Sequence, residues 1–392
     1  MKPRISISIS AITFLAALAI PPRVAGQEQQ NNHYLRQESK LIEFDAPGAS
    51  ISPGLGTQAL ANNDFGAVVG FYTDTNVVSH GFLRLTSGKI ISLDAPGAGL
   101  QPGTGQGTTA YSINDLGEIA GAFQDDKNVF HAFLRSSSGS FAIFDAPGAG
   151  TGLMPPQDCF LVCGQGTWAF NVNLRGDAAG IYIDANNFAH GFVRSRDGKI
   201  TTFDAPDASP QSLGTFVCEE TCLSPQGAVT GFYFDSNDTV HGYVREPDGS
   251  VTEFDWPDAG TGAFQGGGGA SINPQGAITG YVTTSNNDHH GYIRSPGGEF
   301  TAIDDPSASS AHGTVAFSIN LLGAVTGFYV DVNRVWHGFE RSSCGSFTNF
   351  DAPDGGKGPR QGTRPSTNNL EGEVTGWYID ANSVNHGFVW IP

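Results

Sequence analysis

Residues 107–148 read GTTAYSINDLGEIAGAFQDDKNVFHAFLRSSSGSFAIFDAPG, and this stretch decides the fold. It contains four short runs rich in aromatic and β-branched residues: Gly107–Ile113, Glu118–Phe123, Phe130–Arg135 and Ser140–Phe144. Turn-forming residues separate the runs, and this pattern predicts short β-strands joined by hairpins. The stretch therefore predicts four strands that follow one another in chain order.

Three markers of this stretch recur along the chain. One is the aspartate of a D-x-P element, at positions 45, 94, 145, 204, 255, 304 and 351. Another is the histidine of a His-Gly-Phe element or a close variant, at positions 80, 131, 190, 241, 290, 337 and 386. The third is a G-x-x-x-G element in each repeat. Self-similarity with a period near 50 residues is typical of β-propeller blades.

The order of the strands predicts how the repeats close. The first repeated run, Leu41–Phe44, is of the fourth-strand type, and the last, Phe388–Trp390, is of the third-strand type. The N-terminal strand can therefore complete the last blade, which removes exposed sheet edges. We predict an all-β, seven-bladed β-propeller over residues 40–392, built from four-stranded repeats of about 50 residues. A β-solenoid is the rival architecture.

Turn chemistry explains the unusual glycine content of 53 residues in 392. The first connection is N-x-x-G, as in Asn114 to Gly117, which suits a type I turn. The second is usually D-x-N, as in Asp74 to Asn76, where the aspartate can bond the turn backbone and the asparagine tolerates a left-handed conformation. The glycine therefore marks turns rather than a flexible chain.

Composition excludes several classes of protein. The 38 acidic residues outnumber the 20 lysines and arginines, and the formal net charge is −18. Such a surface repels phosphates, so we expect no nucleic-acid partner. Aromatic residues make up 11% of the chain, which argues against disorder, and the scarcity of lysine argues against a coiled coil.

The N-terminus predicts an exported protein. Residues 1–26 combine a basic start, an apolar stretch and small residues, which is the pattern of a secretory signal peptide. Residues 27–39 are polar and aperiodic, and we expect a disordered leader. No later apolar run is long enough to span a bilayer, so we expect a secreted or periplasmic monomer without membrane insertion.

The signal peptide together with tandem His-Gly-Phe or His-Ala-Phe units, such as His131-Ala132-Phe133, resembles the HAF-type extracellular repeat proteins of bacteria. The resemblance covers nearly all of the mature chain. It implies an extracellular or periplasmic repeat protein, and it supplies no catalytic residue.

The repeated polar residues have two interpretations. An aspartate lies six residues before the motif histidine in six repeats, as in Asp74 and His80, while the fifth repeat has Thr284 before His290. This pair could form an acid–base dyad or a metal site. Because it recurs in every blade, we favour a hydrogen bond that stabilises the blade. Calcium binding by the D-x-N loops is an alternative, but two side chains per loop are too few, so we predict no cofactor.

The residues that break the repeat are the better candidates for a binding site. The alternation of connections places the D-x-N hairpins and the D-x-P links on one edge, which we expect to be acidic and to attract cations or basic partners. Unrepeated residues expected there are Trp256, Trp336, His289 and His312. The last link adds Lys357, Arg360 and Arg364. We predict a non-catalytic binding or scaffold module that engages an extracellular glycan or protein through this acidic, tryptophan-containing face.

Two other functions remain open. One is an extracellular polymer-degrading lyase or hydrolase that uses His289 or His312, although the sequence has no known nucleophile or metal-protease motif. The other is a structural protein of the cell envelope.

Five cysteines complete the candidate residues. Cys159 and Cys163 form one C-x-x-x-C pair, and Cys218 and Cys222 form another. In an oxidising compartment they predict two disulfides with three possible connectivities. We expect Cys344, in a hairpin turn, to be free.

Overall fold

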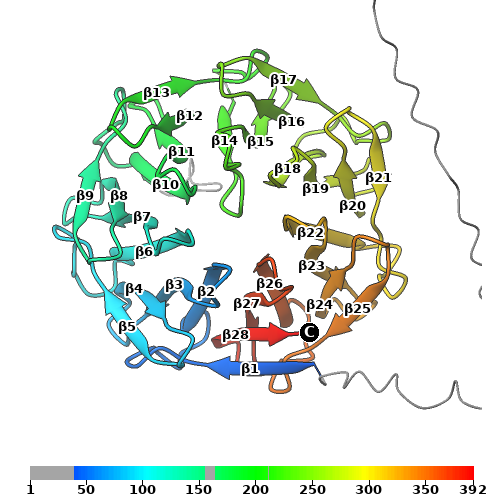
Figure 1. Ribbon diagram of the computed structural model, residues 1–392, viewed down its shortest axis with the longest axis horizontal. Coiled ribbons are helices and arrows are strands. Elements are labelled where there is room, and N and C mark those ends of the chain that lie inside the picture. Colours follow the sequence, from blue (N-terminus) through cyan, green and yellow to red (C-terminus); the bar gives the residue numbers. More distant parts are fainter. Residues whose placement is uncertain (1–38, 155–163, 211) are drawn as a thin grey trace, which may run out of the picture. The chain divides into compact units, whose positions relative to one another are not determined.

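The computed structural model describes residues 39–154, 164–210 and 212–392, and these residues form β-strands and no helix. The predicted signal peptide, residues 27–38 of the predicted leader, and Cys159 and Cys163 lie outside the described residues. The described strands fall into groups of four, which we call units (Figure 1).

Each unit has a first strand near the common centre of Figure 1 and a fourth strand at the periphery. The first strands are β2 (Thr57–Asn62), β6 (Gly107–Ile113), β10 (Gly166–Val172), β14 (Thr215–Val217), β18 (Gly266–Ile272), β22 (Thr314–Ile319) and β26 (Gly362–Asn368). The second strands are β3 (Val68–Thr73), β7 (Ile119–Gln124), β11 (Ala178–Ile183), β15 (Val229–Phe234), β19 (Ile278–Thr283), β23 (Val325–Val330) and β27 (Val374–Ile379). The third strands are β4 (Ser79–Arg84), β8 (Phe130–Arg135), β12 (Ala189–Arg194), β16 (Val240–Arg245), β20 (His289–Arg294), β24 (Trp336–Arg341) and β28 (Asn385–Ile391). The fourth strands are β5 (Ile90–Leu93), β9 (Phe141–Phe144), β13 (Ile200–Phe203), β17 (Val251–Phe254), β21 (Phe300–Ala302), β25 (Phe347–Phe350) and β1 (Lys40–Phe44).

Neighbouring strands within a unit pair antiparallel, as hairpin connections require. In the unit quoted at the outset, β6 and β8 have the predicted bounds, and β7 and β9 differ from the prediction by a residue at one or both ends. The aromatic residue of the His-Gly-Phe element is buried in every unit: Phe82, Phe133, Phe192, Tyr243, Tyr292, Phe339 and Phe388. The core of each unit is therefore built on this repeated ring.

One glycine at the start of each first strand permits close contact between consecutive units. Gly107 has a φ of 125°, and a Cβ there would collide with the backbone oxygen of Ser79 in the preceding unit. The residue Gly166 has a φ of 126° and the same relation to the backbone of Phe130. Positive φ and the lack of space both exclude a side chain. Some of the excess glycines therefore allow consecutive units to pack closely and do not form hairpin turns.

The first strands other than β14 share a β-bulge. The pairing of β10 with β11 shifts register between Ala169 and Asn171, and the same shift occurs in β2, β6, β18, β22 and β26. The residue skipped by the shift in β10 is Phe170. A bulge turns its extra side chain out of the regular alternation.

Strand β1 lies far in sequence from its partner. It pairs antiparallel with β28, from Lys40 opposite Ile391 to Phe44 opposite Gly387. The third-strand type of β28 and the fourth-strand type of β1 agree with the order of strands in the other units.

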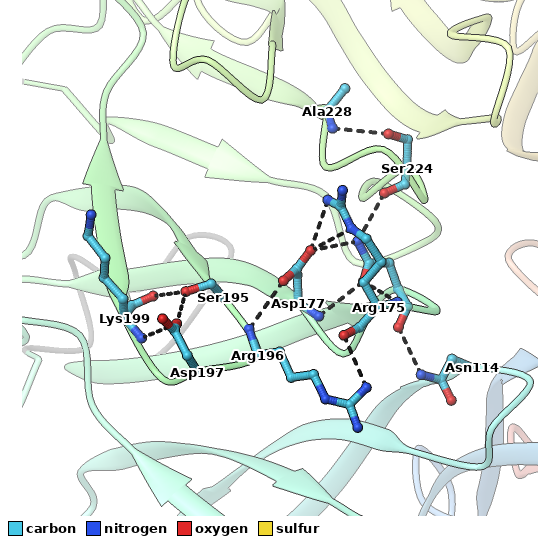
Figure 2. A network of polar contacts seen from close by, with 10 residues as sticks. Asn114, Arg175, Asp177, Ser195, Arg196, Asp197, Lys199, Ser224 and Ala228 are labelled. Atoms are coloured by element: carbon cyan, nitrogen blue, oxygen red, sulfur yellow. Dashed lines mark hydrogen bonds and ion pairs between the residues drawn. The ribbon is translucent and has the colours of Figure 1, made fainter.

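Buried asparagines of the N-x-x-G turns link consecutive units. The Asn114 side-chain amide donates to the Asn173 carbonyl oxygen at 2.8 Å, and Asn173 donates to the Ser224 carbonyl at 3.2 Å (Figure 2). The last turn donates to the first, from Asn369 to the Asn63 carbonyl at 3.1 Å. Each buried amide is thereby satisfied by the neighbouring unit.

Candidate functional site

The edge that carries the D-x-N turns and the D-x-P links, called the D-x-P edge below, holds one histidine per unit between two carboxylates. His190 Nδ1 lies 2.9 Å from Asp204 Oδ1 of the D-x-P element, and its Nε2 lies 3.8 Å from Asp184 Oδ2 of the D-x-N turn. The ring also stacks on Tyr182 at 4.7 Å. The hydrogen bond to Asp204 is the largest influence on the pKa of His190, which is raised despite partial burial.

The aspartate six residues before the histidine, which was predicted to be its partner, therefore makes the longer of the two contacts. The shorter contact is to the D-x-P aspartate fourteen residues later, which the sequence alone did not single out. The fifth unit keeps the arrangement with a different residue: Asp288 Oδ2 lies 3.7 Å from His290 Nε2, although Thr284 replaces the usual aspartate. Recurrence in all units, including the pair His386 and Asp45 at opposite ends of the chain, indicates a structural contact.

The D-x-N turns use their polar groups internally. Asp184 Oδ1 accepts bonds from the backbone nitrogens of Asn186 at 2.8 Å and Phe188 at 2.9 Å, and Asp184 Oδ2 accepts one from the Asn186 amide. The left-handed residue is Asn187, with a φ of 69°, one position after the asparagine of the D-x-N element. The Asx turn moves the positive φ one position further along. In the described residues, no group of three or more His, Cys, Asp or Glu side chains could hold a metal ion.

Acidic residues collect on the D-x-P edge, as predicted. In the unit of β14 to β17, a hollow is lined by Asp207, Asp235, Glu253 and Asp255 around His241. The hydrogen bond from His241 to Asp255 raises the pKa of the imidazole, so part of the acidic charge is balanced below that pKa.

Three of the four predicted site residues converge on one pocket of the D-x-P edge. His289, His312 and Trp336 line a hollow of about 300 Å³ together with Arg334 and Arg360, and we call it the rim pocket. His289 and Trp336 begin neighbouring third strands, β20 and β24, while His312 lies in the link between these units. The rim pocket is therefore a basic place on an acidic edge, which differs from the predicted acidic surroundings.

Contacts within the rim pocket fix its polar groups. Arg334 Nε donates to His312 Nε2 at 3.3 Å, and the Arg360 backbone nitrogen donates to the Arg334 carbonyl at 2.7 Å. Burial and the neighbouring His312 lower the pKa of His289, so this imidazole is neutral at pH 7. With its Nε2 lone pair engaged, His312 is poorly placed to act as a base through that atom.

Trp256 does not join the rim pocket. It is half-buried and packs against Tyr292 at 5.8 Å and Phe300 at 5.4 Å between ring centroids. Its position follows the D-x-P aspartate, where most units have a buried alanine. The side chain of that position points between consecutive units, which is why the tryptophan packs there.

Arg364 also lies elsewhere than predicted. It belongs to strand β26 and not to the preceding link, and its guanidinium lies over four rings at 5.1 to 5.9 Å: Phe317, Phe328, Trp336 and Trp377. The Gly362-Thr363 dipeptide matches the start of other first strands, such as Gly107-Thr108. This match was the signal in the sequence that a first strand begins at Gly362.

A central cavity of about 430 Å³ is lined by residues of first and second strands, including Arg364 of β26, together with Val240 of β16 and Phe264 of a link. The bulge residues Phe170 and Phe317 contribute to its wall. In the unit of β14, residues 218–222 replace the simple bulge with a longer loop, closed by a disulfide between Cys218 and Cys222. This confirms one of the predicted pairings, and Cys344 is exposed and free, as predicted.

The loop presents Glu219 and Glu220 to the central cavity. Their side chains reach solvent there, yet the surrounding protein and the Glu219 carboxylate raise the pKa of Glu220 to about 8. Arg364 opposes this rise. Sequence reasoning missed both glutamates as site residues. The extra length of this repeat between Val217 and Leu223 was the signal.

Among the described residues there is no helix with the length and hydropathy that a membrane crossing requires. The chain matches no protein-family model and no curated protein.

Three solved structures align with much of the chain. Puromycin hydrolase is 12% identical with a TM-score of 0.49, and the match covers 86% of this chain and 52% of that one. The acylaminoacyl peptidase of Pyrococcus horikoshii is 10% identical with a TM-score of 0.45, over 82% of this chain and 49% of that one. The six-bladed β-propeller lectin of Aleuria aurantia is 13% identical with a TM-score of 0.42, over 80% and 94%. The chain spans about half the length of the first two. With TM-scores below 0.5, we draw no conclusion from them.

Proposed function

We propose that residues 40–392 form a closed seven-bladed β-propeller of an exported protein, with the HAF-type repeat as its blade. Three contacts between residues 40–63 and residues 369–391 support closure. They are the pairing of β1 with β28, the contact of Asp45 with His386, and the bond from Asn369 to Asn63. Closure removes the exposed edges that would otherwise promote aggregation.

We further propose that this propeller is a non-catalytic binding module for an acidic extracellular glycan, held in the rim pocket. The observation that carries the proposal is the convergence of His289, His312 and Trp336, three unrepeated residues of neighbouring units, beside Arg334 and Arg360. Functional side chains that depart from a repeat and meet in one hollow suit a binding site on a regular scaffold.

The chemistry of the rim pocket supports an acidic sugar. Arg334 and Arg360 are exposed and present guanidinium donors, which bind carboxylate or sulfate groups in planar geometry. Trp336 lines the pocket with an aromatic ring of the kind on which sugar rings stack, and Arg364 lies over that ring at 5.7 Å. The acidic remainder of the edge repels any anion that lacks these contacts, so specificity is favoured.

The test compares oligosaccharides of equal length that do and do not carry uronic acids, with affinity measured by calorimetry. We expect the acidic members to bind more tightly, and Arg360→Gln to weaken them by about tenfold. The control is Lys89→Gln, which removes one exposed positive charge from a turn between third and fourth strands. Equal affinity for acidic and neutral sugars, or equal loss in both variants, would contradict the proposal.

The same panel separates the alternatives. Turnover of a polysaccharide that is abolished by His312→Gln would favour the lyase or hydrolase. Capture of a basic or acidic protein with no sugar binding would favour a protein partner. Absence of both would favour a structural role.

A further inference from the structure

The central cavity is built where one repeat departs most from the others. In most units a single bulge residue interrupts the first strand, but β14 ends at Val217 and the five-residue loop 218–222 follows. The loop carries Glu219 and Glu220, and both line the cavity. Enlarged bulges are common next to functional sites because they redirect side chains.

Contacts with strands β10 and β18 hold this loop in place. Asn171 of β10 bonds both of its ends: its amide nitrogen donates to the Cys218 carbonyl at 3.0 Å, and its amide oxygen accepts from the Cys222 nitrogen at 2.8 Å. The Thr221 carbonyl accepts from the Ile272 nitrogen of β18 at 2.9 Å. The disulfide closes the loop further. The two glutamates are therefore presented by a fixed scaffold, which lowers the entropic cost of binding.

The charges of the cavity are unbalanced. Among the described residues, neither glutamate side chain accepts a hydrogen bond from another residue. Arg364 is the one cation among the residues that line the cavity in the described chain, and it is held within its own set of four rings. When both carboxylates are ionised, two negative charges face one guanidinium, and this state of the cavity favours the entry of another positive charge.

The walls of the cavity suit a cation with an apolar body. Rings of Phe170, Phe216, Phe264 and Tyr281 line it in addition to Phe317. The faces of aromatic rings attract cations, most strongly where water is excluded, as the position of Arg364 already illustrates in this protein. The volume of about 430 Å³ is within the range of small-molecule sites.

We propose that the central cavity binds a small organic cation, an ammonium group carried on an apolar body, with Glu219 and Glu220 facing the charge. This site is separate from the rim pocket and has the opposite charge preference. A divalent metal ion fits less well, because two carboxylates supply few of the oxygen ligands that calcium requires.

The titrating groups that face the cavity give the proposal a pH signature. They are Glu219, Glu220, Arg364 and Tyr281, and Tyr111 lines an adjoining hollow with the same two glutamates. Burial raises the pKa of both tyrosines, so they stay neutral, while the surrounding protein raises the pKa of Glu220 to about 8. A cation that binds the ionised carboxylates must displace the proton. Its affinity should therefore increase as the pH rises through about 8.

The experiment measures binding by calorimetry with benzyltrimethylammonium, whose charge does not depend on pH. The comparison ligands are 2-phenylethanol, which is neutral, and 3-phenylpropanoate, which is anionic. We expect the cation to bind at least about tenfold more tightly than either. We expect the double variant Glu219→Gln, Glu220→Gln to lose that preference while its affinity for the alcohol is unchanged.

The control variant is Glu371→Gln, which removes an exposed carboxylate from a turn away from the cavity. Circular dichroism and the melting temperature establish that both variants fold. Equal binding of cation and alcohol, or no binding of the cation at all, would overturn the proposal. It would also be overturned if the double variant kept the preference or if calcium alone displaced the cation. Failure of the rim pocket to bind sugars leaves this result unaffected, because the probes and the variants differ.

Discussion

At the scale of single residues, a repeated group and an unrepeated group serve different purposes. Each motif histidine is held between two aspartates, and in the described units this contact recurs from His80 to His386. Because it is the same in each unit, it stabilises the edge of the sheet rather than marking one place on it. His312, in contrast, has no counterpart in the repeat and bonds Arg334 in the rim pocket.

The histidine contacts predict a pH-dependent stability. Hydrogen bonds to the D-x-P aspartates raise the pKa of His131, His190, His241, His337 and His386. A raised folded-state pKa stabilises the protein fully below the unfolded value of 6.5, and this stability is lost as the pH rises through the folded value. We expect the melting temperature to be higher at about pH 6 than at about pH 8.5.

The variant His190→Gln tests the origin of this dependence. Glutamine keeps a hydrogen-bonding side chain but no charge, so the loss of stability should be larger at about pH 6 than at about pH 8.5. His312→Gln, outside these contacts, should show no such difference.

At low pH the aspartates of the same contacts change stability in the opposite direction. Backbone bonds lower the pKa of Asp184 despite partial burial, so its contribution is lost as the pH falls below 3.8 through the folded value.

At the scale of elements, the bulge of the first strands decides which side chains face the cavity. In a regular strand, alternate residues face opposite sides, and an extra residue changes the face of those that follow. In β10 the bulge brings Phe170 to the cavity and leaves Asn171 to bond the 218–222 loop. A single strand therefore lines the site and supports it.

The variant Asn171→Ala tests this support. It leaves the Cys222 nitrogen and the Cys218 carbonyl without their partner, so we expect a loss of about 1–3 kcal/mol in the free energy of unfolding. Amide exchange should accelerate at Cys222 and in the loop around it. Asn186→Ala, in an exposed turn, should cost less than about 0.5 kcal/mol. Similar losses in both variants would show that the loop does not depend on Asn171.

At the scale of the whole molecule, the first and the last described strands meet in one unit. Strand β1 supplies the fourth strand beside β28, and Arg84 of the next unit lies over the Phe44 ring at 4.9 Å. Loss of β1 would expose the edge of β28 and remove the Asp45 contact of His386. Exposed strand edges pair with other chains.

A chain that starts at residue 46 tests closure against one that starts at residue 39. We expect the shorter chain to melt at least about 5 °C lower and to aggregate, because a complete strand is missing. Adding a synthetic peptide of residues 39–48 should restore the melting temperature. If the two chains melt alike, β1 does not contribute to stability.

The repeat itself was determined by the sequence. Turn residues at fixed positions specify hairpins, and hairpins alternate between two edges, so the sharing of one edge by D-x-N and D-x-P acids followed from chain order alone. The type of the first and last strands likewise predicted the pairing of β1 with β28. The turns are local features, since each depends on residues only a few positions apart, whereas the pairing of β1 with β28 follows from the order of strand types along the chain.

The tertiary structure decided which side chains contact one another and which residues line the rim pocket and the central cavity. The histidine bonds the aspartate fourteen residues later because the fourth strand pairs beside the third. Arg364 faces the central cavity because strand β26 begins at Gly362. Trp256 packs between units, whereas Trp336 reaches the rim pocket. Such outcomes depend on which strands of different units approach one another. A sequence shows the order of the strands, but only their packing in space brings Glu219, Glu220 and Arg364 to one cavity.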